Sequence, residues 1–406
     1  MRMAHQNESG RLVVNIEPSL KRRLYGALAL SGFTFKDWLT REAERFCSPV
    51  NGRAVSQPPA SMAALGNTLS EPIPDASHAS IRNNGNSHGA PSPRKASTKA
   101  GSSKLKVISL FCGCGGMDLG FRGDFNIFGR HYDALPYEII WANDINPEAC
   151  RTYEQNLGGE IHCGDIWSLM DKLPRQADVV IGGFPCQDIS VNGKRAGVNG
   201  ARSGLYKAMV EVIKKVKPKV FAAENVKALM NHPEWLHQVL GDFSKLGYDV
   251  DCKLYKAADY GVPQTRERVI FVGTRRGGKP FVPPEPERNA SNWMTAREAI
   301  GDLEDVCESP HINHIWSRAN QSPEQGSRRF YADRPGYTIR AECHGNIHYH
   351  YNQPRRISMR EAARIQSFPD NFIFYSGLRE IERQVGNAVP PILAWHVANS
   401  IAKCAA

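Results

Sequence analysis

The sequence predicts an α/β fold built on a doubly wound sheet. From residue 105 onward, short apolar or β-branched runs bounded by Gly, Pro or charged residues alternate with helical stretches, which is the pattern of such sheets. Strands are expected at 105–111, 137–143, 177–182, 219–224 and 268–273, and helices at 204–215 and 233–246. Ligands of these sheets bind beyond the carboxyl ends of the strands, so the candidate site is expected there.

Length and composition exclude several other classes. The chain has 406 residues, 41% of them hydrophobic and 23% charged, which suits two or three globular domains. It contains no apolar run of about 18 residues that could span a membrane, and no signal-peptide pattern at its start. Its ten cysteines show no regular pairing, which favours free thiols over a disulfide framework. We therefore expect a cytoplasmic protein without membrane contact.

The positive charge is concentrated near the N-terminus. The net charge is +10, and residues 1–47, 48–104 and 105–406 contribute +3, +4 and +3. Charge alone therefore does not make the largest part a nucleic-acid binder. Residues 48–104 lack Phe, Trp, Tyr and Cys, and are dominated by Ser, Pro, Asn, Gly and Ala. Such a segment buries too little apolar surface to fold, so it is expected to be a disordered linker.

Residues 1–47 are expected to form a short β-α-α module. Residues 11–16 alternate as a strand, and two short helices are expected to follow, starting near Pro18 and near 34. Such a small unit needs dimerisation to complete its core. Its order and size resemble a ribbon-helix-helix DNA-binding module, which implies that Arg11, Val13 and Asn15 face base edges in a major groove. The alternative is a small helical appendage that docks on the main domain.

A glycine-rich turn follows the first expected strand of the main domain. Residues 109–116 allow close approach of the backbone to a ligand before a helix begins. Phe111 is placed to cover an adenine ring, Asp144 to accept hydrogen bonds from ribose hydroxyls, and Asp165 to meet the adenine amino group. The number of residues between the turn and Asp144 is larger than in the usual nucleotide-binding pattern, because an extra segment lies at 122–136.

Two ligand classes are disfavoured. The chain has no Gly-Lys-Ser/Thr sequence, which excludes a Walker-type ATPase. No metal site is expected. Cys112 and Cys114 lack a second cysteine pair, and His344, His348 and His350 lack the usual cysteine partners of zinc.

The segment 182–190 holds a candidate nucleophile. Two glycines and a proline place Cys186 on a tight loop directly after a strand, where a thiolate can react if positive charge or hydrogen-bond donors lie nearby. Glu224 ends another strand, and Arg266 and Arg268 occupy alternate positions just before a third. Residues 386–391 precede a C-terminal helix. Each segment alone is also compatible with a structural role.

Together and in this order, these segments resemble the DNA (cytosine-5)-methyltransferase family. The resemblance covers residues 104–406 and is carried by 111–116, Asp144, Asp165, 185–187, 224–226, 264–268, 360–369 and 386–391. Ser358 and Glu361 are spaced as a capping box before the penultimate motif. Two departures are visible: Ser109 stands where the family often has an acid, and Asp188-Ile189 replaces the family's more common pair before Ser190.

The resemblance implies an S-adenosylmethionine-dependent methyltransferase sheet with a smaller target-recognition domain. It implies catalytic parts at 105–274 and 358–406, and a target-recognition region at 275–357. The methyl donor would be held by Phe111, Gly113, Gly116, Asp144, Asp165, Ile166, Pro185, Leu205, Asn387, Ala388 and Val389.

The resemblance also implies the chemistry. Cys186 would attack carbon 6 of a cytosine flipped out of double-stranded DNA, and Glu224 would bond ring nitrogen N3 and the exocyclic amine. Arg266 and Arg268 would steady the base and the cysteine region electrostatically. Within 275–357, Arg340 is a candidate DNA contact, with Arg328, Arg329, Arg355 and Arg356 as further candidates. Expected partners are a cognate restriction endonuclease and a second copy joined through the N-terminal module, which could regulate its own gene. The alternatives are an RNA cytosine-5 methyltransferase and a DNA-binding regulator with an inactive enzymatic part.

Overall fold

The computed structural model describes Arg41 and residues 104–184, 204–319, 328–341 and 347–405. Contacts divide the chain into two units, residues 1–94 and 95–406. The expected N-terminal module with Arg11, Val13 and Asn15, and the expected linker, lie outside the described residues apart from Arg41. The loop that carries Pro185 and Cys186 also lies outside them.

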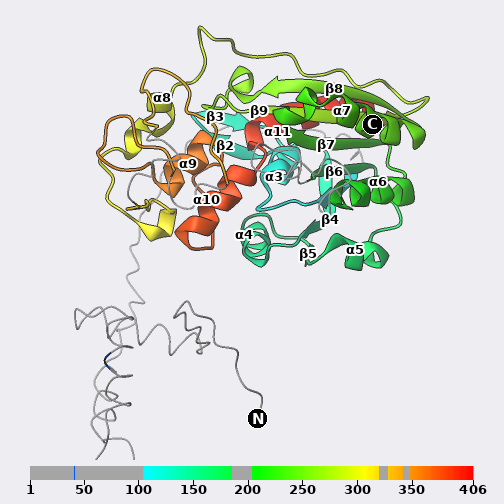
Figure 1. Ribbon diagram of the computed structural model, residues 1–406, viewed down its shortest axis with the longest axis horizontal. Helices are drawn as coiled ribbons and strands as arrows, with labels where there is room; N and C mark the ends of the chain where they lie inside the picture. The colour runs from blue at the N-terminus through cyan, green and yellow to red at the C-terminus, as the bar shows by residue number, and fades with distance from the viewer. Residues whose placement is uncertain (1–40, 42–103, 185–203, 320–327, 342–346, 406) are drawn as a thin grey trace, which may run out of the picture. The chain divides into compact units, whose positions relative to one another are not determined.

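The described residues of the second unit form a seven-stranded sheet with the order β5-β4-β1-β6-β7-β9-β8 (Figure 1). The strands are β1 (Leu105–Leu110), β4 (Tyr137–Asp144), β5 (Ile161–Cys163), β6 (Val179–Gly183), β7 (Val220–Val226), β8 (Tyr248–Lys256) and β9 (Glu267–Arg275). The first five strands of this order pair in parallel, whereas β9 runs antiparallel to both of its neighbours. The predicted α/β fold class is confirmed.

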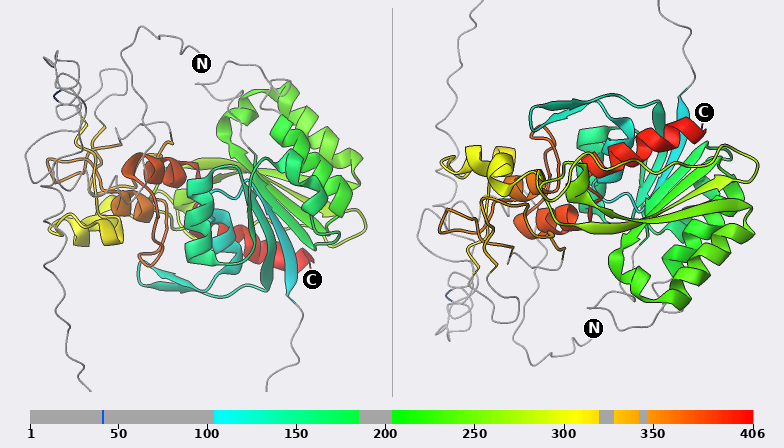
Figure 2. Two further views of the ribbon diagram at one scale, coloured as in Figure 1. Left: turned by 90° about the horizontal axis from the view of Figure 1, so that it is seen from below. Right: turned by 90° about the horizontal axis from the view of Figure 1, so that it is seen from above.

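Helices cover both faces of this sheet (Figure 2). In β6, Val179 and Ile181 pack into one apolar core, while Val180 packs into the other, as expected for side chains that alternate across a sheet. Helices α3 (Gly116–Arg122) and α11 (Pro391–Ala405) contribute to the first core, and α6 (Gly204–Val216) and α7 (Pro233–Lys245) to the second. Two further helices, α4 (Pro147–Leu157) and α5 (Ile166–Leu169), follow β4 and β5.

All five predicted strands and both predicted helices are present, with small shifts at their ends. The sequence did not predict β5 and β8. Strand β8 lies at the sheet edge and alternates Asp and Lys with apolar residues, so it contains no apolar run. The extra segment at 122–136 contains a two-stranded hairpin, β2 (Phe125–Ile127) paired with β3 (Arg130–Tyr132).

The residues between β9 and the C-terminus contain little regular structure before α10. They contain the helices α8 (Ala296–Ile300), α9 (Met359–Ile365) and α10 (Leu378–Asn387) and the 3-10 turns η7 (Gly301–Leu303) and η8 (Pro310–Ile312). Earlier 3-10 turns are η2 (Met170–Lys172), η5 (Lys227–Asn231) and η6 (Ala257–Tyr260). Phe330, Ile339 and Phe374 pack into the same core as α3 and α11, so this region shares its apolar interior with the seven-stranded sheet.

The capping box predicted at the start of α9 is confirmed. The hydroxyl of Ser358 accepts from the backbone N–H of Glu361, and the Glu361 carboxylate accepts from the backbone N–H of Ser358. This satisfies two N–H groups at the helix start. In the part of the chain that the structure describes, no helix is long and apolar enough to cross a membrane.

Candidate active site

A cavity of about 430 Å³ lies at the carboxyl ends of the parallel strands. Twelve of the predicted site residues line it: Phe111, Gly113, Asp144, Asp165, Ile166, Leu205, Glu224, Arg266, Arg268, Asn387, Ala388 and Val389. Its volume is within the range of small-molecule sites. Residues that are far apart in the sequence are therefore brought to one place, as predicted from the sheet type.

Gly116 was expected at the cofactor, but it does not line this cavity. It begins α3 and packs against the segment that leads into α11. A Cβ at this position would lie 2.5 Å from the carbonyl oxygen of Val389 and 3.1 Å from the Cβ of Ala388. The glycine therefore allows close packing of the cavity wall, rather than direct approach to a ligand.

The turn after β1 has an unusual backbone. Phe111 has a φ of 53°, in the left-handed region that a residue with a side chain rarely adopts, and Gly113 follows with a φ of 56°. Such conformations persist where surrounding contacts fix them, and they concentrate at ligand sites. Here the N–H of Cys112 donates to the carbonyl of Asn143 (2.9 Å), and the N–H of Gly113 donates to the Asp144 carboxylate (2.8 Å).

Asp144 organises the cavity at the end of β4. One carboxylate oxygen accepts from the N–H of Gly113, and the other accepts from the N–H of Asn146 at 2.8 Å. Burial raises the pKa of Asp144, while these N–H groups act in the opposite direction. A carboxylate has about four acceptor sites, so two backbone bonds leave capacity for ligand hydroxyls. Asp165 caps α5 by accepting from the N–H of Trp167 at 3.1 Å.

Several cavity residues were missed from the sequence, and Ile145 and Asp118 are two of them. Ile145 follows Asp144 and is 69% exposed although it is aliphatic, so it offers an apolar surface at the cavity. Asp118 lies on α3 and is fully buried, where it accepts from the hydroxyls of Ser109 (3.0 Å) and Tyr153 (2.9 Å). Burial raises the pKa of Asp118 to about 6. The acid that is absent at position 109 thus has a counterpart on the neighbouring helix.

Glu224 and Arg268 form an ion pair on two adjacent strands. The Nε atom of Arg268 lies 2.7 Å from a carboxylate oxygen of Glu224, and both side chains are mostly buried. Burial lowers the pKa of Arg268, and the Glu224 charge opposes this shift. Gly183 lies opposite Glu224 in the neighbouring strand, where an added Cβ would lie 3.0 Å from the carboxylate. The strand pairing therefore leaves space for this acid at the cavity.

Arg266 lines the cavity but is almost completely buried. It was expected to steady a bound base, but only 1% of it is exposed. Its terminal nitrogens donate to the carbonyls of Ile339 (3.1 Å) and Gly386 (2.9 Å). Burial lowers its pKa strongly, and the nearby Arg268 adds to this effect. In this arrangement Arg266 joins the segment before Arg340 to the end of α10.

The described residues lead directly into the loop of Cys186. Strand β6 ends at Gly183, paired with Glu224, and the side-chain amide of Asn225 donates to the carbonyl of Phe184 at 3.1 Å. Because Pro185 and Cys186 come next in the sequence, the loop begins beside the Glu224–Arg268 pair.

The fold and the cavity define an α/β enzyme that binds a nucleotide-like cofactor at the carboxyl ends of its strands. The chain belongs to the C-5 cytosine-specific DNA methylase family, whose model matches residues 105–329 and 317–403. It is therefore a DNA (cytosine-5)-methyltransferase, and its methyl donor is S-adenosylmethionine.

Individual relatives agree with this assignment. The chain is 37% identical over 336 residues to the Type II methyltransferase M.NgoFVII of Neisseria gonorrhoeae, which covers 74% of this chain and 87% of that protein. It is 34% identical to M.BbvI of Brevibacillus brevis, covering 71% and 88%. The fold is similar to that of S. pombe Dnmt2 methyltransferase, with a TM-score of 0.55 at 16% identity over 73% of this chain and 98% of that one.

Proposed function

We propose that this protein methylates carbon 5 of a cytosine in a specific duplex sequence as the modification enzyme of a restriction–modification system. The observation that supports this most is the position of the Glu224–Arg268 pair, in the cavity and beside the start of the Cys186 loop. The relatives named above are Type II methyltransferases, which favours a cognate endonuclease as partner. Such a role belongs in the cytoplasm, where chromosomal DNA lies.

The chemistry requires covalent help from the protein. Carbon 5 of cytosine is a poor nucleophile because its electrons belong to an aromatic ring. Addition of the Cys186 thiolate to carbon 6 breaks this aromaticity and gives carbon 5 enamine character, so one difficult step is divided into two. Glu224 would hold N3 and the exocyclic amine as electrons enter the ring. A base within a duplex is out of reach, so the cytosine must first be flipped into the site.

The cavity residues suit the bound methyl donor. Asp144 has acceptor sites left for ribose hydroxyls, Ile145 and Phe111 offer apolar surface to the adenine, and Asp165 lies at the same wall. Bound S-adenosylmethionine supplies the methyl group to carbon 5. Arg268 keeps Glu224 oriented through their ion pair. Removal of the carbon 5 proton and departure of Cys186 then complete the reaction.

Replacement of Asp144 by Ala is expected to weaken S-adenosylmethionine binding about 10- to 100-fold, because hydrogen bonds to a charged group are each worth about 1.5–3 kcal/mol. The change also frees the N–H groups of Gly113 and Asn146, which loosens the turn. Isothermal titration with S-adenosylmethionine measures the effect. The matched control is Asp171→Ala, which removes an exposed acid in η2. Equal affinity of the Asp144 variant and the wild type would remove Asp144 from the binding site.

Bisulfite sequencing of host DNA tests the proposed function directly. Expression of the protein should protect cytosines in one recurring sequence context from conversion, and the Cys186→Ala variant should leave them unprotected. The experiment reports the base, the position and the context together. Methylation of RNA with unmodified host DNA would contradict the DNA substrate.

We also propose that residues 1–47 form a dimeric DNA-binding module that restrains expression of the protein's own gene. The proposal rests on the β-α-α pattern in the sequence and on Arg11, Val13 and Asn15 as base contacts. Deletion of residues 1–47 should abolish binding to the promoter, as measured by gel shift, while methylation of a short duplex stays unchanged. Promoter affinity that survives this deletion would exclude the regulatory role.

A further inference from the structure

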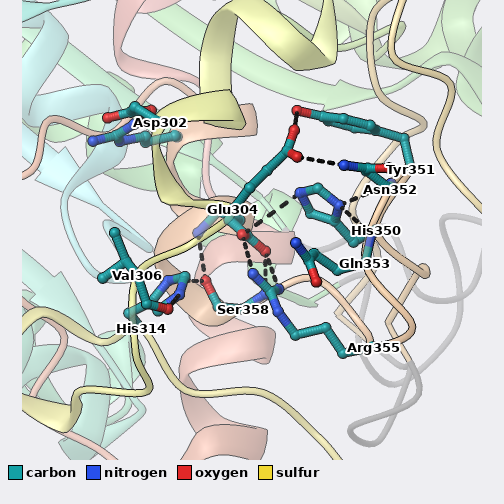
Figure 3. A network of polar contacts seen from close by, with 12 residues as sticks. Asp302, Glu304, Val306, His314, His350, Tyr351, Asn352, Gln353, Arg355 and Ser358 are labelled. Atoms are coloured by element: carbon teal, nitrogen blue, oxygen red, sulfur yellow. Dashed lines mark hydrogen bonds and ion pairs between the residues drawn. The ribbon is translucent and has the colours of Figure 1, made fainter.

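Five arginines of the region 275–357 are candidates for contact with DNA, and the structure gives them different surroundings. Arg355 makes two hydrogen bonds of 2.8 Å to the fully buried carboxylate of Glu361, and its guanidinium lies 4.4 Å from the ring centre of Trp316. Figure 3 shows Arg355 inside a polar network with His350 and Ser358, rather than directed to solvent. Arg355 therefore stabilises the fold of this region.

Two more of the five are tied to the backbone. Arg329 donates to the carbonyls of His350 (2.7 Å) and Gln353 (3.1 Å). Arg356 is only 3% exposed, donates to the carbonyl of Ile347 (2.6 Å) and lies 4.3 Å from the ring centre of Tyr349. These contacts connect the loops of the region. The guanidinium groups of Arg329 and Arg356 are therefore engaged within the protein and are poor candidates for ligand binding.

Arg328 and Arg340 differ from the other three. Both are exposed, and neither guanidinium forms a hydrogen bond or ion pair with another residue that the structure describes. Arg328 lies 5.9 Å from the ring centre of Tyr337, which in turn packs 5.4 Å from the ring of His348. We call the surface over Tyr337 and His348 the Tyr337–His348 platform. Arg328 lies over Tyr337, and the charges of Arg328 and Arg340 both act on His348.

The platform carries the positive charge of Arg328 and Arg340. Burial, and after it the charges of Arg328, Arg340 and Arg356, lower the pKa of His348 to about 4, and no carboxylate among the described residues opposes them. Like charges held close together destabilise a protein unless an anion lies between them. The imidazole is neutral at pH 7, so the charge is that of the arginines. An anionic ligand would therefore bind here favourably.

Buried contacts fix Arg340 beside the active site. The preceding residue, Ile339, donates its N–H to the side chain of Gln264 (3.1 Å) and accepts from Arg266 through its carbonyl. The backbone of Arg340 itself packs against the end of α10, where a Cβ on Gly386 would lie 2.6 Å from the Arg340 carbonyl carbon. Gly386 and the next three residues line the cavity. Arg340 is thus preorganised at the edge of the catalytic pocket.

We propose that Arg328 and Arg340 bind phosphates of the DNA backbone next to the target cytosine, whereas Arg329, Arg355 and Arg356 maintain the fold of the recognition region. This inference rests on the proposed methylation of duplex DNA. Phosphates are the favoured ligand, because a guanidinium pairs strongly with phosphate oxygens whatever the base sequence. Such contacts position the duplex and contribute the same affinity to every sequence.

The test uses the full-length chain and a short duplex that carries the site mapped by bisulfite sequencing. Arg328→Gln and Arg340→Gln are each expected to lower kcat/KM for this duplex about tenfold, as expected for loss of a charge-assisted hydrogen bond. The slope of log(kcat/KM) against log salt should become shallower by about 0.9 for each phosphate that the variant no longer neutralises. The preference for the mapped site over a site with one mismatch should stay constant. Arg175→Gln, at the amino end of β6, is the control and should behave as wild type.

The outcomes separate this inference from the proposed function. If the wild type methylates the duplex and both variants match it in rate and salt slope, the phosphate contacts are wrong, although the enzyme assignment stands. Loss of the preference for the mapped site over the mismatched site, with an unchanged salt slope, would also contradict the phosphate contacts. It would indicate that these arginines contact base edges instead. Absence of DNA methylation by the wild type would instead contradict the proposed function. Titration of each variant with S-adenosylmethionine verifies that the cofactor site is intact.

Discussion

Replacement of Cys186 by Ala is expected to abolish DNA methylation, with a fall in kcat of about 10⁴-fold or more. The thiol is the proposed group that adds to the ring, and removal of a nucleophile typically costs this much or more. Affinity for S-adenosylmethionine should change little, because Asp144, Asp165 and the turn after β1 remain in place. Methyl transfer to a cognate duplex and titration with the cofactor measure the two quantities separately.

The matched control for this variant is Cys404→Ala. Cys404 lies near the end of α11, next to Ala405, whose carbonyl accepts from Lys219 just before β7. It is therefore near the amino ends of the strands, opposite the cavity, and its removal should leave kcat unchanged. A duplex with 5-fluorocytosine at the target position should form a denaturant-resistant adduct with the wild type and with this control, but not with Cys186→Ala. An adduct that forms without Cys186 would remove it as the nucleophile.

The sequence predicted the sheet because periodicity is a local property. Runs of apolar residues flanked by Gly, Pro or charge mark buried strands, and the five predicted in this way are all present, four of them parallel and β9 antiparallel. Strand β8 was not predicted because its edge position allows alternating polar residues. Strand β5 was not predicted because it spans only three residues. Prediction was therefore most successful for the interior of the sheet and weakest at its edges.

The site was predicted less completely, because side-chain partners depend on distant parts of the chain. The residues that line the cavity could be anticipated from motifs that follow strand ends. The partners of Arg266 could not, since the carbonyls of Ile339 and Gly386 lie many residues away and no local pattern marks them. Likewise, spacing alone gives no reason to separate Arg340 from Arg355, whereas a buried Glu361 beside one of them does.

Replacement of Glu224 by Gln is expected to lower kcat about 10²- to 10⁴-fold. This is the usual contribution of a general acid or base to the rate. The amide has nearly the same shape and retains an oxygen that can accept from Arg268 at the 2.7 Å contact. It lacks the negative charge that would favour a protonated N3 as electrons enter the ring. Steady-state methylation with saturating duplex and cofactor measures kcat.

Structural damage is the main competing explanation for such a loss. Breaking a buried ion pair costs about 3–5 kcal/mol when one charge is left without a partner. Gln keeps an acceptor at this position, so the midpoint of thermal unfolding should fall less for Glu224→Gln than for Glu224→Ala, although both should lose activity. Glu211→Gln, on the exposed side of α6, should lose neither. If activity followed the unfolding midpoint across these variants, Glu224 would act by holding Arg268 in place, and the direct contact with the cytosine ring would be wrong.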